Sequence, residues 1–223
     1  MARQQERARR TRAAIIRSAA VEFGKSGYAA ASLNRILEGS RATKGAMYFH
    51  FDSKEDLARA VLDSASEHYR RTVERWLGRA DLGPLDVLHG VFDELALRLE
   101  HDIVVKAVFR LVVDPGFRRH SNAGCRMLSA TIREQVRQAI TQGQLRADTD
   151  PDRFTRTLAG ALIGQRYIAD MNEPQGWGPD LRSRFRESLE VVVQASCTQE
   201  WAESFGEHGW RASARLDDLA VSS

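Results

Sequence analysis

The stretch SLNRILEGSRATKGAMYFHFDSK, residues 32–54, decides the fold. It reads as two short helices joined by a tight turn. Ser32 is suited to cap the first helix, whose apolar residues recur every three or four positions. Gly39 is expected to end that helix, because glycine accepts the left-handed conformation that a helix C-terminus needs. The second helix is expected from about Thr43 to about Phe51.

The second helix has two chemically different faces. Met47 and Phe51 lie four residues apart and can anchor one face. The other face offers a hydroxyl, an ammonium, bare backbone, a phenol and an imidazole, from Thr43, Lys44, Gly45, Tyr48 and His50. This split fits a helix that reads DNA, because a scaffold holds one face while small and polar groups reach base edges and phosphates.

Lys44 is the predicted major-groove contact, since its ammonium can donate to guanine O6 and N7. Tyr48 is expected to donate to a phosphate, and Thr43 to cap the helix and bind a phosphate at once. His50 is expected either to bind a phosphate or to pack at the helix end. For Phe49, both a core and a surface position remain open. The predicted DNA contacts are Arg7, Thr11, Ser32, Thr43, Lys44, Gly45, Tyr48, His50 and Lys54.

The charge distribution is consistent with a polyanionic partner. Residues 1–54 carry 11 Lys and Arg against 4 Asp and Glu, a net charge of +7, whereas the rest of the 223-residue chain is slightly acidic. Such a basic segment could also be only a solvated surface, but here it coincides with the helix-turn-helix pattern. Residues 1–10 are expected to be disordered without DNA.

The chain resembles the TetR family of bacterial transcriptional repressors from about Thr11 to Leu62, including the run TKGAMYFHF. That run is most similar to the γ-butyrolactone autoregulator receptors of antibiotic-producing actinomycetes and their non-binding relatives, the pseudo-receptors. The resemblance implies a homodimer on a palindromic double-stranded DNA operator, repression as the usual mode, and a role in secondary metabolism. It also implies a four-helix dimer interface formed by the last two long helices.

The whole chain reads as all-α, because the body lacks the period-two alternation of strands. Residues 1–53 are the predicted DNA-binding domain, 54–200 a helical ligand-binding and dimerisation domain, and 201–223 a tail or short helix. The spacing Ser53 to Asp56 indicates a capping box at the start of a long helix, about 54–78, which is the natural lever between the two parts. Helices of about 152–170 and 180–196 are the dimer candidates, with apolar area from Ala161, Ile168, Leu189, Val192 and Val193 beside Gly160 and Gly164.

The body can enclose a small-molecule effector, since ligand sites are mostly apolar with a few polar groups. A solid core remains the alternative. The segment NAGCRMLSAT, residues 122–131, lacks the tryptophan that autoregulator receptors carry near the start of the pocket helix. This departure favours a pseudo-receptor, or a different signal such as a furan or an antibiotic intermediate. The candidate ligand contacts are Leu88, Phe92, Val108, Phe109, Leu128, Thr131, Gln135, Leu162 and Gln165.

Other functions find little support in the residues. There is no nucleophile elbow, phosphate-binding glycine loop or metal-spaced cluster, so neither an enzyme nor a cofactor or metal site is expected, although an uncharacterised helical enzyme stays the rival reading. No apolar run approaches the length of a membrane span. Cys125 and Cys197 lack metal-type spacing, and a disulfide between them is not expected. These features predict a cytoplasmic protein.

Overall fold

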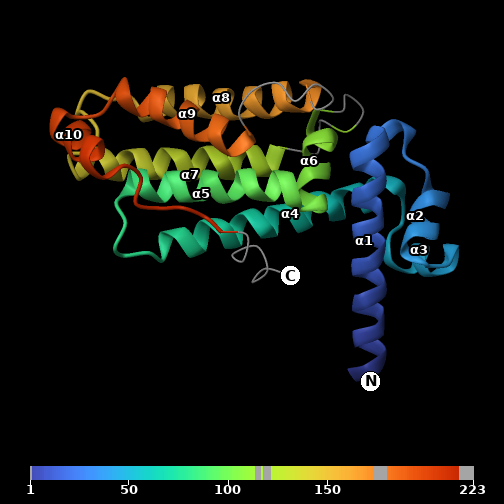
Figure 1. Ribbon diagram of the computed structural model, residues 1–223. Helices are drawn as coiled ribbons and strands as arrows, with labels where there is room; N and C mark the ends of the chain where they lie inside the picture. The colour runs from blue at the N-terminus through green and yellow to red at the C-terminus, as the bar shows by residue number, and fades with distance from the viewer. Residues whose placement is uncertain (1, 114–116, 118–121, 173–179, 216–223) are drawn as a thin grey trace. The chain divides into compact units, whose positions relative to one another are not determined.

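In the computed structural model, residues 2–113, 117, 122–172 and 180–215 are described. They form ten helices and no strand, which confirms the all-α prediction (Figure 1). The helices are α1 (Ala2–Ala30), α2 (Leu33–Ser40), α3 (Lys44–His50), α4 (Lys54–Leu77), α5 (Pro84–His101), α6 (Ile103–Val113), α7 (Asn122–Thr141), α8 (Pro151–Asn172), α9 (Leu181–Gln194) and α10 (Gln199–His208).

The chain divides into two compact units. Unit 1 comprises residues 1–68 and 99–124, and unit 2 comprises residues 69–98 and 125–223. Helix α4 therefore contributes its first part to unit 1 and its last part to unit 2. The division into domains 1–53, 54–200 and 201–223, which assigns DNA binding to the first and ligand binding and dimerisation to the second, remains a prediction.

Unit 1 is built around α1, which packs against α2, α3 and α6. Its core consists of fully buried apolar side chains, among them Ile15, Ala19, Phe23, Ile36, Met47 and Phe51, together with Leu57 from the start of α4. Helix α1 lies close to α6 at Gly24, where a Cβ would be in ordinary van der Waals contact, 3.7 Å from the Ala107 Cα. The inward stripe thus holds α2 and α3 on α1.

Two expectations about unit 1 are wrong. Helix α1 begins at Ala2, so residues 2–10 are helical rather than disordered. Within α1, Gly27 has non-helical dihedral angles, φ 72° and ψ 173°, so the regular helix is interrupted there. Helix α2 does not end at Gly39. It continues to Ser40, and Arg41 takes the left-handed conformation with φ 53°. Gly39 serves close packing instead, because a Cβ there would lie 2.4 Å from the Ser18 hydroxyl oxygen.

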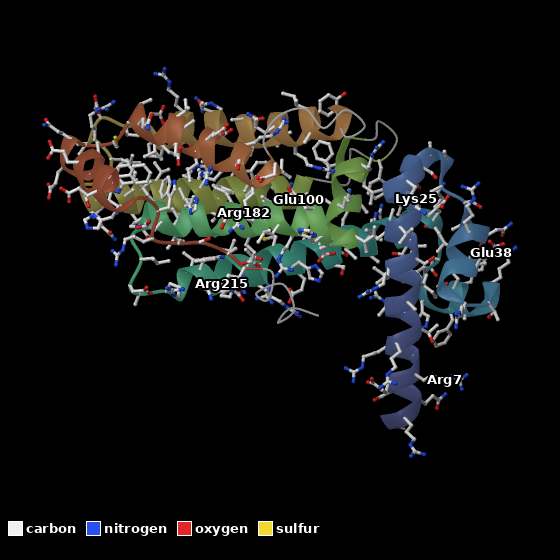
Figure 2. The ribbon with its side chains drawn as sticks, in the orientation of Figure 1. Arg7, Lys25, Glu38, Glu100, Arg182 and Arg215 are labelled. Atoms are coloured by element: carbon white, nitrogen blue, oxygen red, sulfur yellow. The ribbon has the colours of Figure 1, made fainter. Side chains whose placement is uncertain are left out.

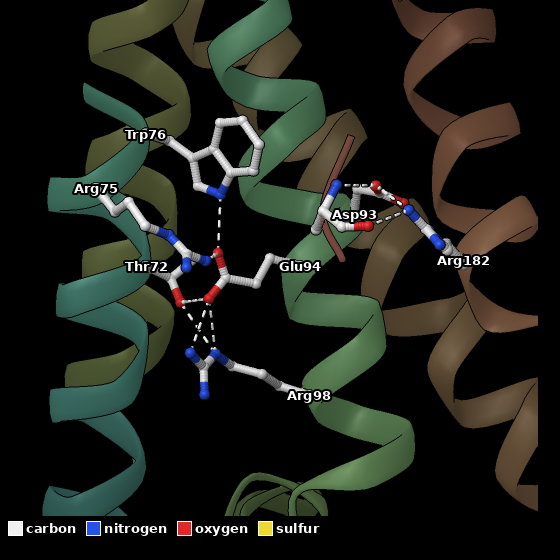
Figure 3. A network of polar contacts seen from close by, with 8 residues as sticks. Thr72, Arg75, Trp76, Asp93, Glu94, Arg98 and Arg182 are labelled. Carbon is white, nitrogen blue, oxygen red and sulfur yellow. Dashed lines mark hydrogen bonds and ion pairs between the residues drawn. The ribbon is translucent and has the colours of Figure 1, made fainter. Parts of the chain in front are cut away.

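Unit 2 contains a network of polar groups in its core. The carboxylate of Glu94 on α5 is fully buried and accepts hydrogen bonds from Thr72 Oγ1 at 2.6 Å and Trp76 Nε1 at 2.9 Å, both on α4 (Figure 3). The guanidinium groups of Arg75 and Arg98 pair with the same carboxylate. A buried carboxylate is tolerated only when it is paired and hydrogen-bonded, and here it joins α4 to α5.

The remaining helices of unit 2 are tied together at their ends. Helices α8 and α9 pack against each other. The loop after α7 meets the turn after α9, where Arg146 N donates to Ser196 O at 2.9 Å and Thr198 Oγ1 donates to Gly143 O at 2.7 Å. Cys197 in that turn is a free thiol, whereas the Cys125 side chain lies outside the described residues. None of the helices described is long and apolar enough to cross a membrane.

Candidate nucleic-acid interface

Helices α2 and α3 form a helix-turn-helix whose turn is fixed by backbone hydrogen bonds. The N–H groups of Arg41 and Ala42 donate to the carbonyls of Glu38 and Leu37, both at 3.1 Å, which satisfies the last turn of α2. Thr43 then caps α3 as predicted, because its side-chain oxygen accepts from Ala46 N at 3.1 Å. The Thr43 side chain is exposed, so its hydroxyl proton remains available to a phosphate oxygen.

Helix α3 has the two faces expected from the sequence. Met47 is buried, and Phe51, which caps the helix, is 2% exposed. On the opposite side Lys44 and Gly45 are exposed, and a Cβ at Gly45 would meet nothing within 4 Å. Tyr48 lies one turn after Lys44 and is 46% exposed. Met47 and Phe51 therefore hold α3 in the core of unit 1, while Lys44, Gly45 and Tyr48 are exposed on its surface.

Phe49 belongs to the exposed face and not to the core. It is 79% exposed, the largest fraction among the exposed large apolar side chains of the described residues. Its ring packs edge-on against that of His50, with 5.0 Å between the ring centroids. Its spacing from Gly45 places the two in one row along α3. Phe49 was not among the predicted contacts. An apolar ring on a helix that reads DNA can contact a thymine methyl, so Phe49 joins the candidate site.

Some predicted DNA contacts already have partners within the protein. The Ser32 side chain accepts from Arg35 N at 3.5 Å, and its backbone N–H donates to the buried Glu22 carboxylate at 3.0 Å. The Lys54 ammonium donates to Ala29 O at 3.1 Å and lies 5.1 Å from the Tyr28 ring centroid. These contacts fasten the end of α1, and a DNA contact by either residue remains a prediction.

The other predicted contacts are distributed along α1 and at the end of α3. Arg7 is exposed on the N-terminal part of α1, which extends past α3 (Figures 1 and 2). The Thr11 hydroxyl donates to Arg7 O at 3.0 Å, and His50 is half-buried between Phe49 and Phe51. Arg12 adds a guanidinium 5.2 Å from the Phe51 ring centroid. Basic groups therefore line α1 and α3 together.

The predicted effector contacts fall in both units. Val108 and Phe109 are half-buried on α6 in unit 1. In unit 2 the structure places Leu88, Phe92, Leu128, Thr131, Gln135, Leu162 and Gln165, of which Leu88, Phe92, Gln135 and Leu162 are buried. Their role as ligand contacts remains a prediction.

Two buried hydroxyl groups of unit 2 were not among those candidates. Burial raises the pKa of Tyr69 to about 12, and its hydroxyl oxygen has no hydrogen-bond partner among the described residues. The hydroxyl of Thr155 on α8 is buried without a hydrogen-bond partner among the described residues. An orphan buried hydroxyl is unusual in a folded protein and often marks a place where a ligand or water binds. Tyr69 was expected only as part of the buried stripe of α4.

No three His, Cys, Asp or Glu side chains gather as metal ligands in the part of the chain that is described. The geometry instead shows an N-terminal helix-turn-helix followed by a helical body. Residues 15–61 match the model of the family described as bacterial regulatory proteins, tetR family.

The chain is similar to TetR-family regulators, among them the autoregulator receptors of actinomycetes. It is 28% identical over 189 residues to the A-factor receptor protein of Streptomyces griseus, covering 85% of this chain and 64% of that protein. It spans between half and two thirds of the length of the first curated relatives that it matches.

Solved structures extend the likeness over nearly the whole chain. The TetR regulator TylP of Streptomyces fradiae superposes with a TM-score of 0.73 at 26% identity, covering 97% of both chains. A γ-butyrolactone receptor described as ArpA-like superposes with a TM-score of 0.63 at 29% identity, covering 85% of this chain and 98% of its own. Other relatives are named as HTH-type transcriptional regulators or repressors, among them ArpR of Pseudomonas putida, which is 34% identical over 110 residues and is matched over 49% of this chain and 50% of that protein.

Proposed function

We propose that the protein is a DNA-binding transcriptional repressor that acts in the cytoplasm as a homodimer on a palindromic operator. The observation that carries the proposal is α3, which is anchored by Met47 and Phe51 and exposes Lys44, Tyr48 and Phe49. Lys44 donates to guanine in the major groove, Tyr48 and Thr43 bind phosphates, and Arg7 reaches the backbone or an adjacent minor groove.

An exposed apolar face on α8 and α9 supports the homodimer. Ile163, Ile168 and Val191 are 45%, 46% and 66% exposed, and the positions of Gly160 and Gly164 are open to an approaching helix. Ile168 is one of the residues predicted for the dimer interface, and its exposure supports that role. Leu189 and Val193 are buried in their own chain, so they pack beneath the proposed interface and do not contact the partner directly.

A small effector releases the DNA in this proposal. The buried Tyr69 and Thr155 hydroxyl groups and the half-buried Thr131 hydroxyl are the polar groups that support an interior site in unit 2. The effector is γ-butyrolactone-like, furan-like or an antibiotic intermediate, and the regulated genes serve secondary metabolism. Because the expected pocket tryptophan is missing from residues 122–131, a pseudo-receptor without an autoregulator ligand is the alternative.

Release works by a shift between two states of the dimer. Helix α4 runs without interruption from Lys54, next to the helix-turn-helix, to Leu77 in unit 2, so it can carry a change from one unit to the other. The effector favours the state in which the two recognition helices no longer match the operator spacing. It can do so only through its difference in affinity for the two states.

A gel-shift titration tests the proposal directly. The purified full-length protein is titrated on the DNA upstream of its own gene and on duplexes that it selects from a random pool, with and without an extract of the producing organism's medium. Binding as one dimer per palindrome, followed by release with the extract, supports the repressor and its effector. Binding without release favours the pseudo-receptor, and failure to select any duplex contradicts DNA binding.

A further inference from the structure

The C-terminal strap, residues 211–215, is held along one face of α5. Its N–H groups donate to the carboxylates of Asp86 at 3.0 Å and Asp93 at 2.7 Å, and one of its carbonyl oxygens lies 2.8 Å from His89 Nδ1. Positions 86, 89 and 93 share a helix face, so they form a row of polar groups for an extended chain. The strap therefore has a defined path over unit 2.

Two further residues fix the strap from its sides. Arg182 on α9 forms a bidentate pair with Asp93 (Figure 3). Its Nη2 also donates to Ser213 Oγ at 3.1 Å and to Ala214 O at 2.7 Å. The Trp210 ring stacks on His89 with 4.6 Å between ring centroids. Hydrogen bonds and stacking together hold the strap more firmly than an exposed chain end usually is.

The strap buries alternate residues. Ala212 and Ala214 are buried against unit 2, whereas Arg211, Ser213 and Arg215 are exposed. This is the period-two pattern of an extended chain. The Arg211 and Arg215 side chains therefore lie on the exposed side of the strap (Arg215 is labelled in Figure 2).

The exposed side of the strap faces the end of α4 across a pocket of about 480 Å³. Four guanidinium groups line it, and its lining residues in the described part of the chain, which include no carboxylate, are Arg75, Trp76, Arg79, Arg211, Ala212, Ser213 and Arg215. The two α4 guanidinium groups are oriented by acids behind them. Arg75 pairs with Glu94, and Arg79 pairs with Asp81 at 2.8 and 2.9 Å.

We propose that this pocket is a binding site for a small phosphate-bearing metabolite, separate from the DNA-reading helix and from any interior effector site. Guanidinium groups match phosphate oxygens in a bidentate geometry, and several of them converging on one pocket favour a multivalent oxyanion over a single carboxylate. The Ser213 hydroxyl accepts from Arg182, so its own proton is free to donate to a phosphate oxygen. The inference is independent of the proposed repressor function.

Calorimetric titration of the full-length protein with inorganic phosphate and with pyrophosphate at low ionic strength tests the site. We expect pyrophosphate to bind more tightly than phosphate, because it can meet more of the guanidinium groups at once. Arg211→Gln and Arg215→Gln should each weaken pyrophosphate binding about tenfold, the usual effect of losing one charge-assisted hydrogen bond. Arg153→Gln on α8, also an exposed arginine, should leave the affinity unchanged.

The variants replace exposed side chains, and unchanged thermal unfolding would show that the strap is still in place. Equal pyrophosphate affinity in the wild type and in the Arg211→Gln, Arg215→Gln double variant would overturn the proposal, because the anion would then be adventitious. Absence of binding to either probe would overturn it too. A double variant that loses DNA affinity but keeps pyrophosphate affinity would assign these arginines to the DNA backbone instead.

Discussion

The side-chain hydroxyl of Ser18 on α1 donates a hydrogen bond to the backbone carbonyl of Ile36 on α2, over 2.8 Å. The contact is possible because Gly39, one turn further along α2, presents no side chain to α1. A Cβ at Gly39 would lie 2.4 Å from the Ser18 oxygen. The helix-turn-helix is thus positioned by a small residue on one helix and a polar residue on the other.

Gly39→Ala should lower the free energy of unfolding relative to Gly45→Ala by about 1 kcal/mol. Both changes remove a helical glycine, but only the first forces Ser18 to rotate and lose its hydrogen bond to Ile36. Chemical unfolding followed by circular dichroism measures the difference. Equal stability of the two variants would show that the contact with Ser18 does not hold α2 in place.

Glu94→Gln should destabilise the protein by roughly 3–5 kcal/mol, the usual cost of removing one partner from a buried ion pair. Arg98 is 2% exposed and would be left as a buried charge whose main partner is gone. Glu74→Gln, which removes an exposed α4 partner of Arg70, should cost less than about 1 kcal/mol. Urea unfolding compares the two. A similar small loss in both would mean that the Glu94 network contributes little.

His89→Gln should weaken the dependence of stability on pH between about pH 7 and about pH 5. Burial lowers the pKa of His89 below its ordinary value, although Asp93 and Ala212 O act in the opposite direction. The unfolded chain therefore binds the proton more readily, and stability falls as the pH falls below the unfolded pKa. Thermal unfolding across this range should show a shallower slope for His89→Gln, whereas His208→Gln, at an exposed site, should keep the wild-type slope. An unchanged slope in His89→Gln would refute the assignment.

Ile163→Asp should dissociate the proposed homodimer, since it places a charge in the middle of the exposed apolar face of α8. Sedimentation equilibrium should show a dissociation constant at least about a hundredfold higher than for the wild type, a loss of about 3 kcal/mol or more. Leu77→Asp changes a similarly exposed apolar residue on α4 and should leave the dimer intact. A monomeric wild-type protein, or an unaffected dimer in Ile163→Asp, would contradict the proposed interface.

Local patterns sufficed to predict much of the helix-turn-helix. The caps Ser32 and Thr43 and the anchors Met47 and Phe51 act within a few residues of their partners, so spacing alone reveals them. Gly39 was misread because its role depends on Ser18, which is distant in sequence. Phe49 was left open because an aromatic residue in a short helix is compatible with either face until the neighbouring helix is in place.

The body was harder to predict because its informative contacts join distant segments. The fully buried Glu94 gave no signal in the sequence, since its partners Thr72 and Trp76 lie about twenty residues away on α4. The C-terminal strap was expected to be part of a tail. Its alternation of alanine with polar residues becomes meaningful only beside the row of Asp86, His89 and Asp93 on α5.

The central claim is that the exposed face of α3 reads DNA, and Lys44→Ala tests it most directly. Fluorescence anisotropy on the duplex selected by the wild-type protein should show binding weakened about 10- to 100-fold, the effect of losing a base contact of about 1–3 kcal/mol. Lys25→Ala, at an exposed lysine near the other end of α1, should bind as the wild type does (Figure 2). Operator affinity in Lys44→Ala equal to that of the wild type would contradict the claim.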